Sequence, residues 1–139
     1  MPRGFRGFFV AGKQYRAPRF VASSIQEDVA ERFMRRLKPA SEHQAPPHQE
    51  PVLWTFHFDA SLPESERCLH VNFIDKNDGT VDDEDEFLFA PYSTFTVRAV
   101  HWEAEPAAND LLMRPHRVEL DVAPDNTRTP LDLPLAPWA

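Results

Sequence analysis

Fourteen prolines and only four glycines are distributed along the 139 residues of this chain. Proline has a fixed φ and no backbone N–H, so it interrupts helices and is excluded from the centre of a sheet. The prolines therefore predict rigid loops that join short strands, rather than long helices. Between these loops lie segments rich in aliphatic and aromatic residues, and we predict strands at 52–58, 69–74, 86–89, 94–102 and 117–122. One or two more strands could come from Tyr15 and from residues 20–22.

One segment has the pattern of a helix. Ser24 and Glu27 match a capping box, in which Ser24 is the N-cap and Glu27 is the third helical residue. Pro39 ends the segment, because proline cannot continue a helix. Between these limits apolar residues recur at spacings of three and four, at Val29, Ala30, Phe33, Met34 and Leu37. The pattern predicts one amphipathic helix with a single buried stripe.

The chain has the length and the hydrophobic content, 42%, of a single folded domain over residues 1–139. Within it, residues 39–51 are proline-rich and polar, which predicts a flexible loop. Residues 123–139 are also proline-rich and predict an extended C-terminal strap that lies across the sheet. Together these features predict an α+β fold. It has a mostly antiparallel core of two packed sheets and one clear helix.

Composition argues against several classes of function. The formal net charge is −7 and no basic patch dominates, so nucleic acid is not expected to be the main partner. Cys68 is the single cysteine, which rules out an intrachain disulfide and a multi-cysteine zinc site. The sequence has no run of about 18 apolar residues and no signal-peptide pattern. We therefore expect a soluble, cytoplasmic protein without a membrane partner.

No metal site is expected either. The six histidines show no HExxH motif and no paired ligand spacing. Residues 75–86 are similar in composition to a calcium-binding EF-hand loop. However, Gly79 occupies the fifth position of that loop instead of the sixth, and residues 69–74 before it have the pattern of a strand, not a helix.

The clearest chemical signal is an acidic pair, Glu84 and Glu86, at the start of the apolar segment 87–89. Two residues at i and i+2 share one face of an extended chain. The sequence thus predicts that the two carboxylates lie where an acidic loop enters a buried strand, so that packing of the strand defines their position. The alternative is a solvated acidic turn before a hairpin, since charge runs usually face water.

The segment 84–97 resembles the Glu-x-Glu motif of the mono-ADP-ribosyltransferases. In that family an acidic pair enters a strand, an apolar-Pro step follows, and a Phe-x-Val strand comes next. By this resemblance Glu86 takes the family's catalytic role, stabilising positive charge on the ribose of NAD. Glu84 engages an incoming guanidinium.

A second segment, 20–33, is similar to the Phe-x-Ser-Thr-Ser strand of the same family, which leads into a helix with a Val-Ala-x-x-Phe pattern. Phe20 matches the motif phenylalanine, while Ser23 and Ser24 match the second and third residues of the Ser-Thr-Ser triplet. Ala22 replaces the first serine, which in the family helps to orient NAD and the catalytic glutamate. This departure bears on the efficiency of the site.

A third segment, Phe5-Arg6-Gly7, is similar to the aromatic-Arg-Gly motif on the first core strand of the family, whose arginine binds the phosphates of NAD. A guanidinium is well suited to this task because it can donate two parallel hydrogen bonds to a pyrophosphate. Arg3, which also precedes a glycine, is the alternative to Arg6. The resemblance therefore assigns the binding of NAD to Arg6, Gly7, Phe20, Ser23 and Ser24.

The three segments follow one another in the family order, and together they resemble the arginine-specific, toxin-like branch. The resemblance implies an ADP-ribosyltransferase-like fold, NAD as co-substrate, no metal, and a protein acceptor with an exposed arginine. Two alternatives remain open. One is an NAD glycohydrolase, which transfers ADP-ribose to water. The other is a catalytically weak or inactive member that serves as an interaction module.

Overall fold

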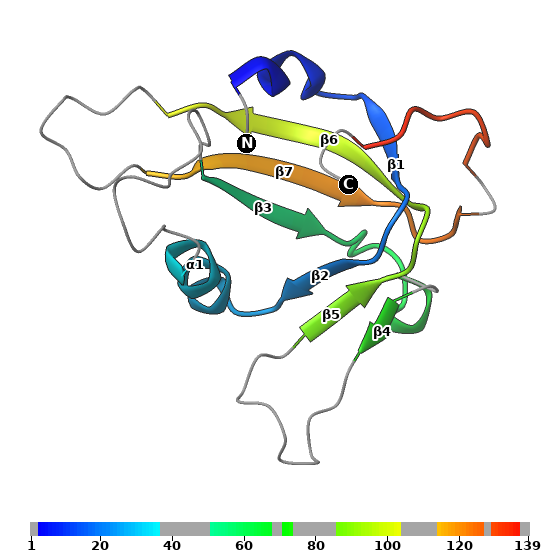
Figure 1. Ribbon diagram of the computed structural model, residues 1–139. Helices are drawn as coiled ribbons and strands as arrows, with labels where there is room; N and C mark the ends of the chain where they lie inside the picture. Colours follow the sequence, from blue (N-terminus) through cyan, green and yellow to red (C-terminus); the bar gives the residue numbers. More distant parts are fainter. Residues whose placement is uncertain are drawn as a thin grey trace, which may run out of the picture.

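The computed structural model describes residues 3–36, 51–67, 71–73, 86–103, 114–126 and 129–136; for residues 3–5, 33–36, 71–73 and 86 the description covers the backbone alone. Seven strands, one α-helix and two 3₁₀ helices lie within these ranges (Figure 1). In chain order the elements are η1 (Arg3–Phe8), β1 (Gln14–Ala17), β2 (Val21–Ser24), α1 (Glu27–Arg36), β3 (Val52–His57), η2 (Glu64–Glu66), β4 (Val71–Phe73), β5 (Glu86–Phe89), β6 (Ser93–His101) and β7 (His116–Val122).

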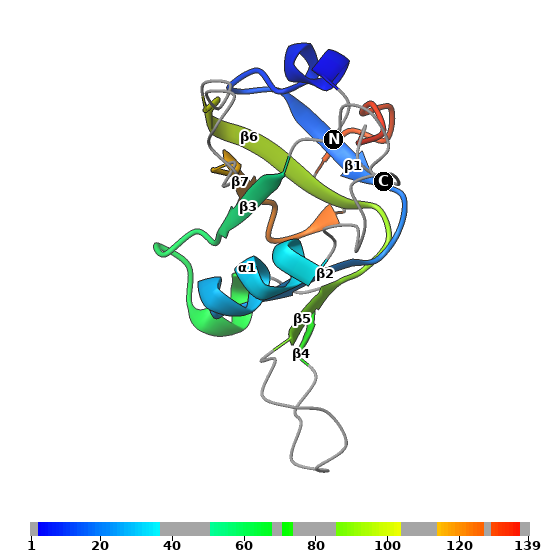
Figure 2. The same cartoon turned by 60° about the vertical axis from the view of Figure 1, so that its left-hand side comes forward.

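The strands form two sheets. The larger sheet has the order β1-β6-β7-β3, and the smaller sheet has the order β2-β5-β4. β1 and β2 follow each other in the chain, as do β5 and β6. Because β1 pairs with β6 and β2 pairs with β5, these two segments lie side by side in both sheets and bend together from one sheet into the other. This arrangement confirms the α+β class and the two-sheet core (Figure 2).

Among the described strands, four of the five pairings are antiparallel. The exception is β3, which runs parallel to β7 and pairs Val52 with His116 at one end and His57 with Asp121 at the other. The prediction of a mostly antiparallel core is therefore right, but the larger sheet is mixed. Local periodicity contains no information on strand direction, so the parallel pair could not be predicted from it.

The core lies where the two sheets face each other. Phe89 from the smaller sheet is 0% exposed, and its ring centroid lies 4.9 Å from that of Phe56 and 5.3 Å from that of Phe95 in the larger sheet. Alternate residues of β7, from His116 to Val122, are also buried in it. Strand alternation therefore gives the larger sheet one apolar face, which the smaller sheet covers.

The helix begins later than the capping box predicts. The Ala30 N–H donates to the Gln26 carbonyl at 3.4 Å, so Gln26 and not Ser24 precedes the first turn. Ser24 instead ends β2, and its Oγ accepts from the Gln26 N–H at 3.1 Å. Val29, the first residue of the predicted stripe, is buried at 2% exposure. The stripe residues Phe33, Met34 and Leu37 have side chains outside the described part of the structure.

The C-terminal segment 129–136, which we call the strap, lies beside β1. The Arg16 N–H donates to the Pro134 carbonyl at 3.0 Å, and the Ala136 N–H donates to the Arg16 carbonyl at 2.8 Å. A parallel bridge joins Arg16 and Leu135 between these bonds. The sequence analysis predicted that the strap lies across the sheet. Instead, the strap hydrogen-bonds to the backbone of Arg16 at the free edge of β1. The predicted flexible loop 39–51 lies outside the described residues except for Pro51.

Candidate functional site

The structure brings two of the sequence-predicted site residues together. In the antiparallel pair of β2 and β5, Ser24 lies directly opposite Glu86, and Ser23 lies opposite Phe87. Residues opposed in this way have Cα atoms about 4.5–5.5 Å apart. The pair stands at the end of the smaller sheet from which the chain continues into α1 (Figure 1). Glu84 lies outside the described residues.

The two serines of β2 and Phe20, which precedes the strand, differ in whether they already contact other parts of the chain. The Ser23 hydroxyl donates across the strand pair to the Phe87 carbonyl at 3.3 Å. The Ser24 hydroxyl accepts the hydrogen bond that turns the chain toward α1. Phe20, just before β2, is 61% exposed, so its ring is accessible to an aromatic group of a ligand.

Arg6 does not join Ser24 and Glu86. It lies in the 3₁₀ helix η1, not on a core strand, and its guanidinium carbon is 5.3 Å from the centroid of the Trp102 ring. Its Nη2 is also 3.2 Å from Nε2 of His116, which is itself buried. Figures 1 and 2 both show η1 well apart from β2 and β5.

The position of η1 has a physical reason. Phe9, which follows it, is 4% exposed and packs its ring 5.2 Å from Trp54 and 6.1 Å from Trp102. Burial of this aromatic residue anchors the N-terminal segment over the larger sheet. At Gly7 a Cβ would meet nothing within 4 Å, so packing does not require glycine there. The side chain of Arg3, the alternative to Arg6, lies outside the described part.

A buried arginine that sequence reasoning missed is Arg16 in β1. It is 6% exposed, and the acceptors of its guanidinium among the described residues are neutral oxygens in the strap and in the turn after β5. Its local signal is weak: a basic residue stands between Tyr15 and Ala17, both of which are buried. An isolated charge is costly to bury, so its hydrogen bonds define how this part of the chain is arranged.

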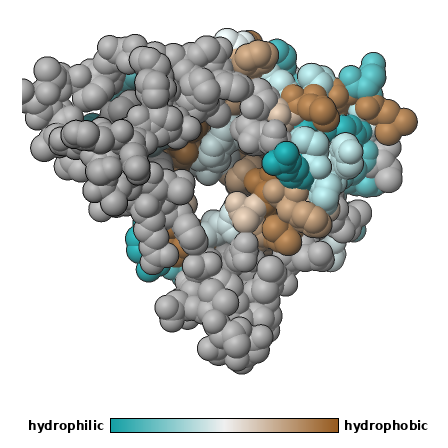
Figure 3. Space-filling view, in the orientation of Figure 1, coloured by the Kyte–Doolittle hydropathy of each residue, from teal (hydrophilic) through white to brown (hydrophobic). Residues whose placement is uncertain are grey.

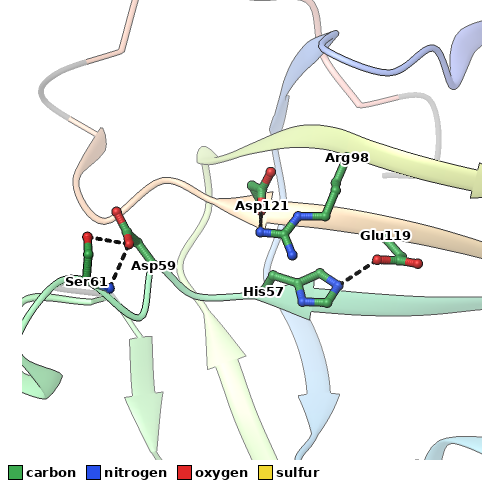
Figure 4. Close-up of polar contacts among 6 residues, drawn as sticks. All are labelled: His57, Asp59, Ser61, Arg98, Glu119 and Asp121. Atoms are coloured by element: carbon green, nitrogen blue, oxygen red, sulfur yellow. Dashed lines mark hydrogen bonds and ion pairs between the residues drawn. The ribbon is translucent and has the colours of Figure 1, made fainter.

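A cavity of about 600 Å³ lies at the ends of β3 and β7. Ionisable side chains lie in and beside it in pairs (Figure 4). His57 Nε2 is 3.0 Å from Glu119 Oε2, and Arg98 Nη2 is 2.5 Å from Asp121 Oδ1. The residues that line the cavity are His57, Phe58, Asp59, Ala60, Arg98, Asp121, Val122 and Pro124.

These side chains are one another's hydrogen-bond and ion-pair partners. Arg98 and Asp121 are 47% and 42% exposed, so their ion pair contributes at most about 1 kcal/mol to stability. His57, for which no role as a ligand was predicted, pairs with Glu119. Within the described ranges no group of three or more histidine, cysteine or acidic residues is placed to hold a metal ion. The cavity is therefore a weaker candidate for a functional site than the pair of Ser24 and Glu86 on β2 and β5.

At the rim of the cavity, hydrogen bonds from the Ser61 Oγ and backbone N–H to Asp59 Oδ1 lower the pKa of the Asp59 carboxyl, with a further contribution from Arg67. We expect Ser61→Ala to raise the pKa of Asp59 toward the usual value for aspartate, because the hydroxyl donor is lost. An NMR titration of the Asp59 carboxyl measures this. Because the native pKa is the depressed one, the linked stabilisation is present above the ordinary aspartate pKa and is lost as pH falls. An unchanged midpoint in the variant would contradict the assignment.

The surface around β2 and the strap contains apolar side chains interspersed with polar ones (Figure 3). Leu131 in the strap is 92% exposed and Leu135 is 58% exposed. In the part of the chain that the structure describes, no helix has the length and apolar character needed to cross a membrane. The chain matches no family model, no curated protein and no solved structure.

Proposed function

We propose that this protein is an NAD-dependent mono-ADP-ribosyltransferase with an ADP-ribosyltransferase-like fold, which moves ADP-ribose to an arginine side chain of another protein. The observation that carries the proposal is the register of β2 against β5, where Ser24 lies opposite Glu86. The two residues come from different motifs, more than sixty positions apart in the sequence, and the resemblance requires that they share one site. Phe20 stands at the other end of β2, before Val21, and its ring is accessible to an aromatic group of NAD.

In the proposed reaction the bond between nicotinamide and the ribose C1 breaks, and its electron pair leaves with nicotinamide. Positive charge develops on the sugar, as it does in glycoside cleavage. The Glu86 carboxylate hydrogen-bonds a ribose hydroxyl and stabilises that charge. A guanidinium nitrogen of the acceptor, held by Glu84, then forms a bond to C1 and releases a proton to solvent. If water takes the place of the acceptor, the product is free ADP-ribose.

Binding of the NAD phosphates requires an arginine close to β2 and β5. Arg6 is engaged with Trp102 and His116 over the larger sheet, so it can serve NAD at β2 and β5 only if η1 leaves that position. Arg3 is the other arginine that the resemblance offers. Ala22 and the placement of Arg6 favour a second candidate function, an interaction module that keeps the fold but cleaves NAD poorly or not at all.

Nicotinamide release from NAD by the purified chain distinguishes the two functions. We expect release by the unmutated protein, and transfer of ADP-ribose when a protein rich in exposed arginine is added. Glu86→Gln is the control, because it retains the shape of the side chain and removes its charge. Absence of nicotinamide release from the unmutated chain, with acceptor present, would favour the interaction module. Release without transfer would identify an NAD glycohydrolase.

A further inference from the structure

Arg16 connects three parts of the chain through one buried guanidinium. Its Nη2 donates to the Thr129 carbonyl at 3.0 Å, to Thr129 Oγ1 at 2.8 Å and to the Pro130 carbonyl at 2.8 Å. Its Nε donates to the same Pro130 carbonyl at 3.2 Å. On its other side Nη1 donates to the Tyr92 carbonyl at 3.2 Å. The strap, β1 and the turn between β5 and β6 therefore meet at this side chain.

Tyr92, one of the residues that Arg16 contacts, has an unusual backbone conformation. Its φ is +65°, and among the described residues it is the single non-glycine residue with a positive φ. That region is unfavourable for a bulky side chain. The Tyr92 ring is 56% exposed, so burial of the ring does not explain the conformation. Two backbone contacts do: the Tyr92 N–H donates to the Ala17 carbonyl at 2.5 Å, and the Tyr92 carbonyl accepts from Arg16.

The turn that holds Tyr92 also determines where β5 ends. β5 has four residues, and its pairing with β2 runs from Phe89 opposite Val21 to Glu86 opposite Ser24. β5 also pairs with β4, but over Phe87–Phe89, so among the described residues Ser24 of β2 is the one partner that lies opposite Glu86. A slip of one residue in a strand moves every side chain to the other face. The conformation of the turn is thus a condition for keeping Glu86 opposite Ser24.

We propose that Arg16 is a positioning residue, which holds Tyr92 in its left-handed conformation and thereby keeps Glu86 in register with Ser24. Thr129 and Pro130 of the strap hold the guanidinium in the orientation that this requires. The effect on register follows from the structure alone, whereas the effect on catalysis rests on the proposed function. Arg16 itself contacts no reacting group.

The test combines Arg16→Lys with Tyr92→Gly. Lysine retains the charge but cannot donate to the strap and to Tyr92 at once, because it lacks the planar fork of arginine. Glycine adopts a positive φ without strain, so the turn no longer needs the bond from Arg16. Amide hydrogen exchange, followed by NMR, reports on each strand separately.

In Arg16→Lys we expect the amides of Phe87 and Phe89 to exchange at least about tenfold faster, while those of β7 exchange as in the unmutated chain. We expect the double variant to regain the original protection, and Tyr92→Gly alone to keep it. If the chain cleaves NAD, kcat should fall in Arg16→Lys with KM unchanged, and should recover in the double variant. Thr129→Val, which removes one acceptor of Arg16 and leaves the charge, should show the same local change at smaller size, and it replaces Arg16→Lys if that variant does not fold.

Equal acceleration in β5 and β7 would overturn the proposal, because it would mean that Arg16 contributes only to global stability. Failure of Tyr92→Gly to restore protection would overturn it as well. The exchange measurement does not depend on NAD. If the unmutated chain cleaves no NAD, the proposed function is refuted. The exchange rates still decide whether Arg16 holds the register of β5.

Discussion

Glu86→Gln is expected to lower the rate of nicotinamide release from NAD by about 10²–10³, or about 3–4 kcal/mol in activation free energy, the usual effect of removing one preorganised charge stabiliser. Transfer to protein should fall by the same factor, since both reactions pass through the same positively charged ribose. Single-turnover release of nicotinamide measures the chemical step directly. A loss of less than about tenfold would show that the Glu86 carboxylate does not face the reacting sugar.

Glu84→Gln is the matched comparison, since it makes the same chemical change two residues away. Water needs no carboxylate to hold it, whereas an incoming guanidinium does. We therefore expect Glu84→Gln to suppress transfer to arginine far more than hydrolysis of NAD. Equal loss of both activities in this variant would refute the division of roles between the two glutamates.

Phe89→Ala is expected to lower the free energy of unfolding by about 3–5 kcal/mol, as large truncations in a packed core do. Phe89 is fully buried, and its ring lies 4.9, 6.1 and 5.3 Å from those of Phe56, Phe58 and Phe95. The substitution removes the central ring from the interface between the two sheets and leaves a cavity. Equilibrium unfolding in denaturant measures the change.

Phe20→Ala is the control for this prediction, because it truncates the same side chain at 61% exposure. We expect it to change the free energy of unfolding by less than about 1 kcal/mol. Similar losses in the two variants would mean that the two sheets do not pack through Phe89. The assignment of β5 as the strand that joins the core to the candidate site would then be wrong.

The sequence predicted the strands more accurately than their partners. The strand predicted at 86–89 is β5 without change, and the strand predicted at 94–102 differs from β6 by one residue at each end. Alternating burial and nearby prolines are local signals, and local signals are enough to locate such elements. That β3 runs parallel to β7 depends on contacts between residues more than sixty positions apart, which no local pattern encodes.

The candidate site was predictable in part, for the same reason. The capping-box pattern places Ser24 at the start of the helix, but pairing with Glu86 extends β2 through Ser24 and delays the helix to Glu27. Tertiary pairing thus overrides a local propensity. Arg16 was missed because its burial depends on the strap, which comes more than a hundred residues later. The position of Arg6 depends on the burial of Phe9, which lies outside the motif Phe5-Arg6-Gly7.

The parallel pair of β3 and β7 has a consequence for synthesis of the chain. β7 is the last of the described strands in the sequence, yet it lies between β6 and β3, and it is the sole neighbour of β3 among them. A chain that emerges from the ribosome N-terminus first therefore carries residues 52–57 without a sheet partner until residues 116–122 have emerged. Throughout that interval Trp54 and Phe56 lack the β7 residues that lie opposite them, Val118 and Leu120. Completion of the larger sheet therefore waits until residues 116–122 have been synthesised and have left the ribosome.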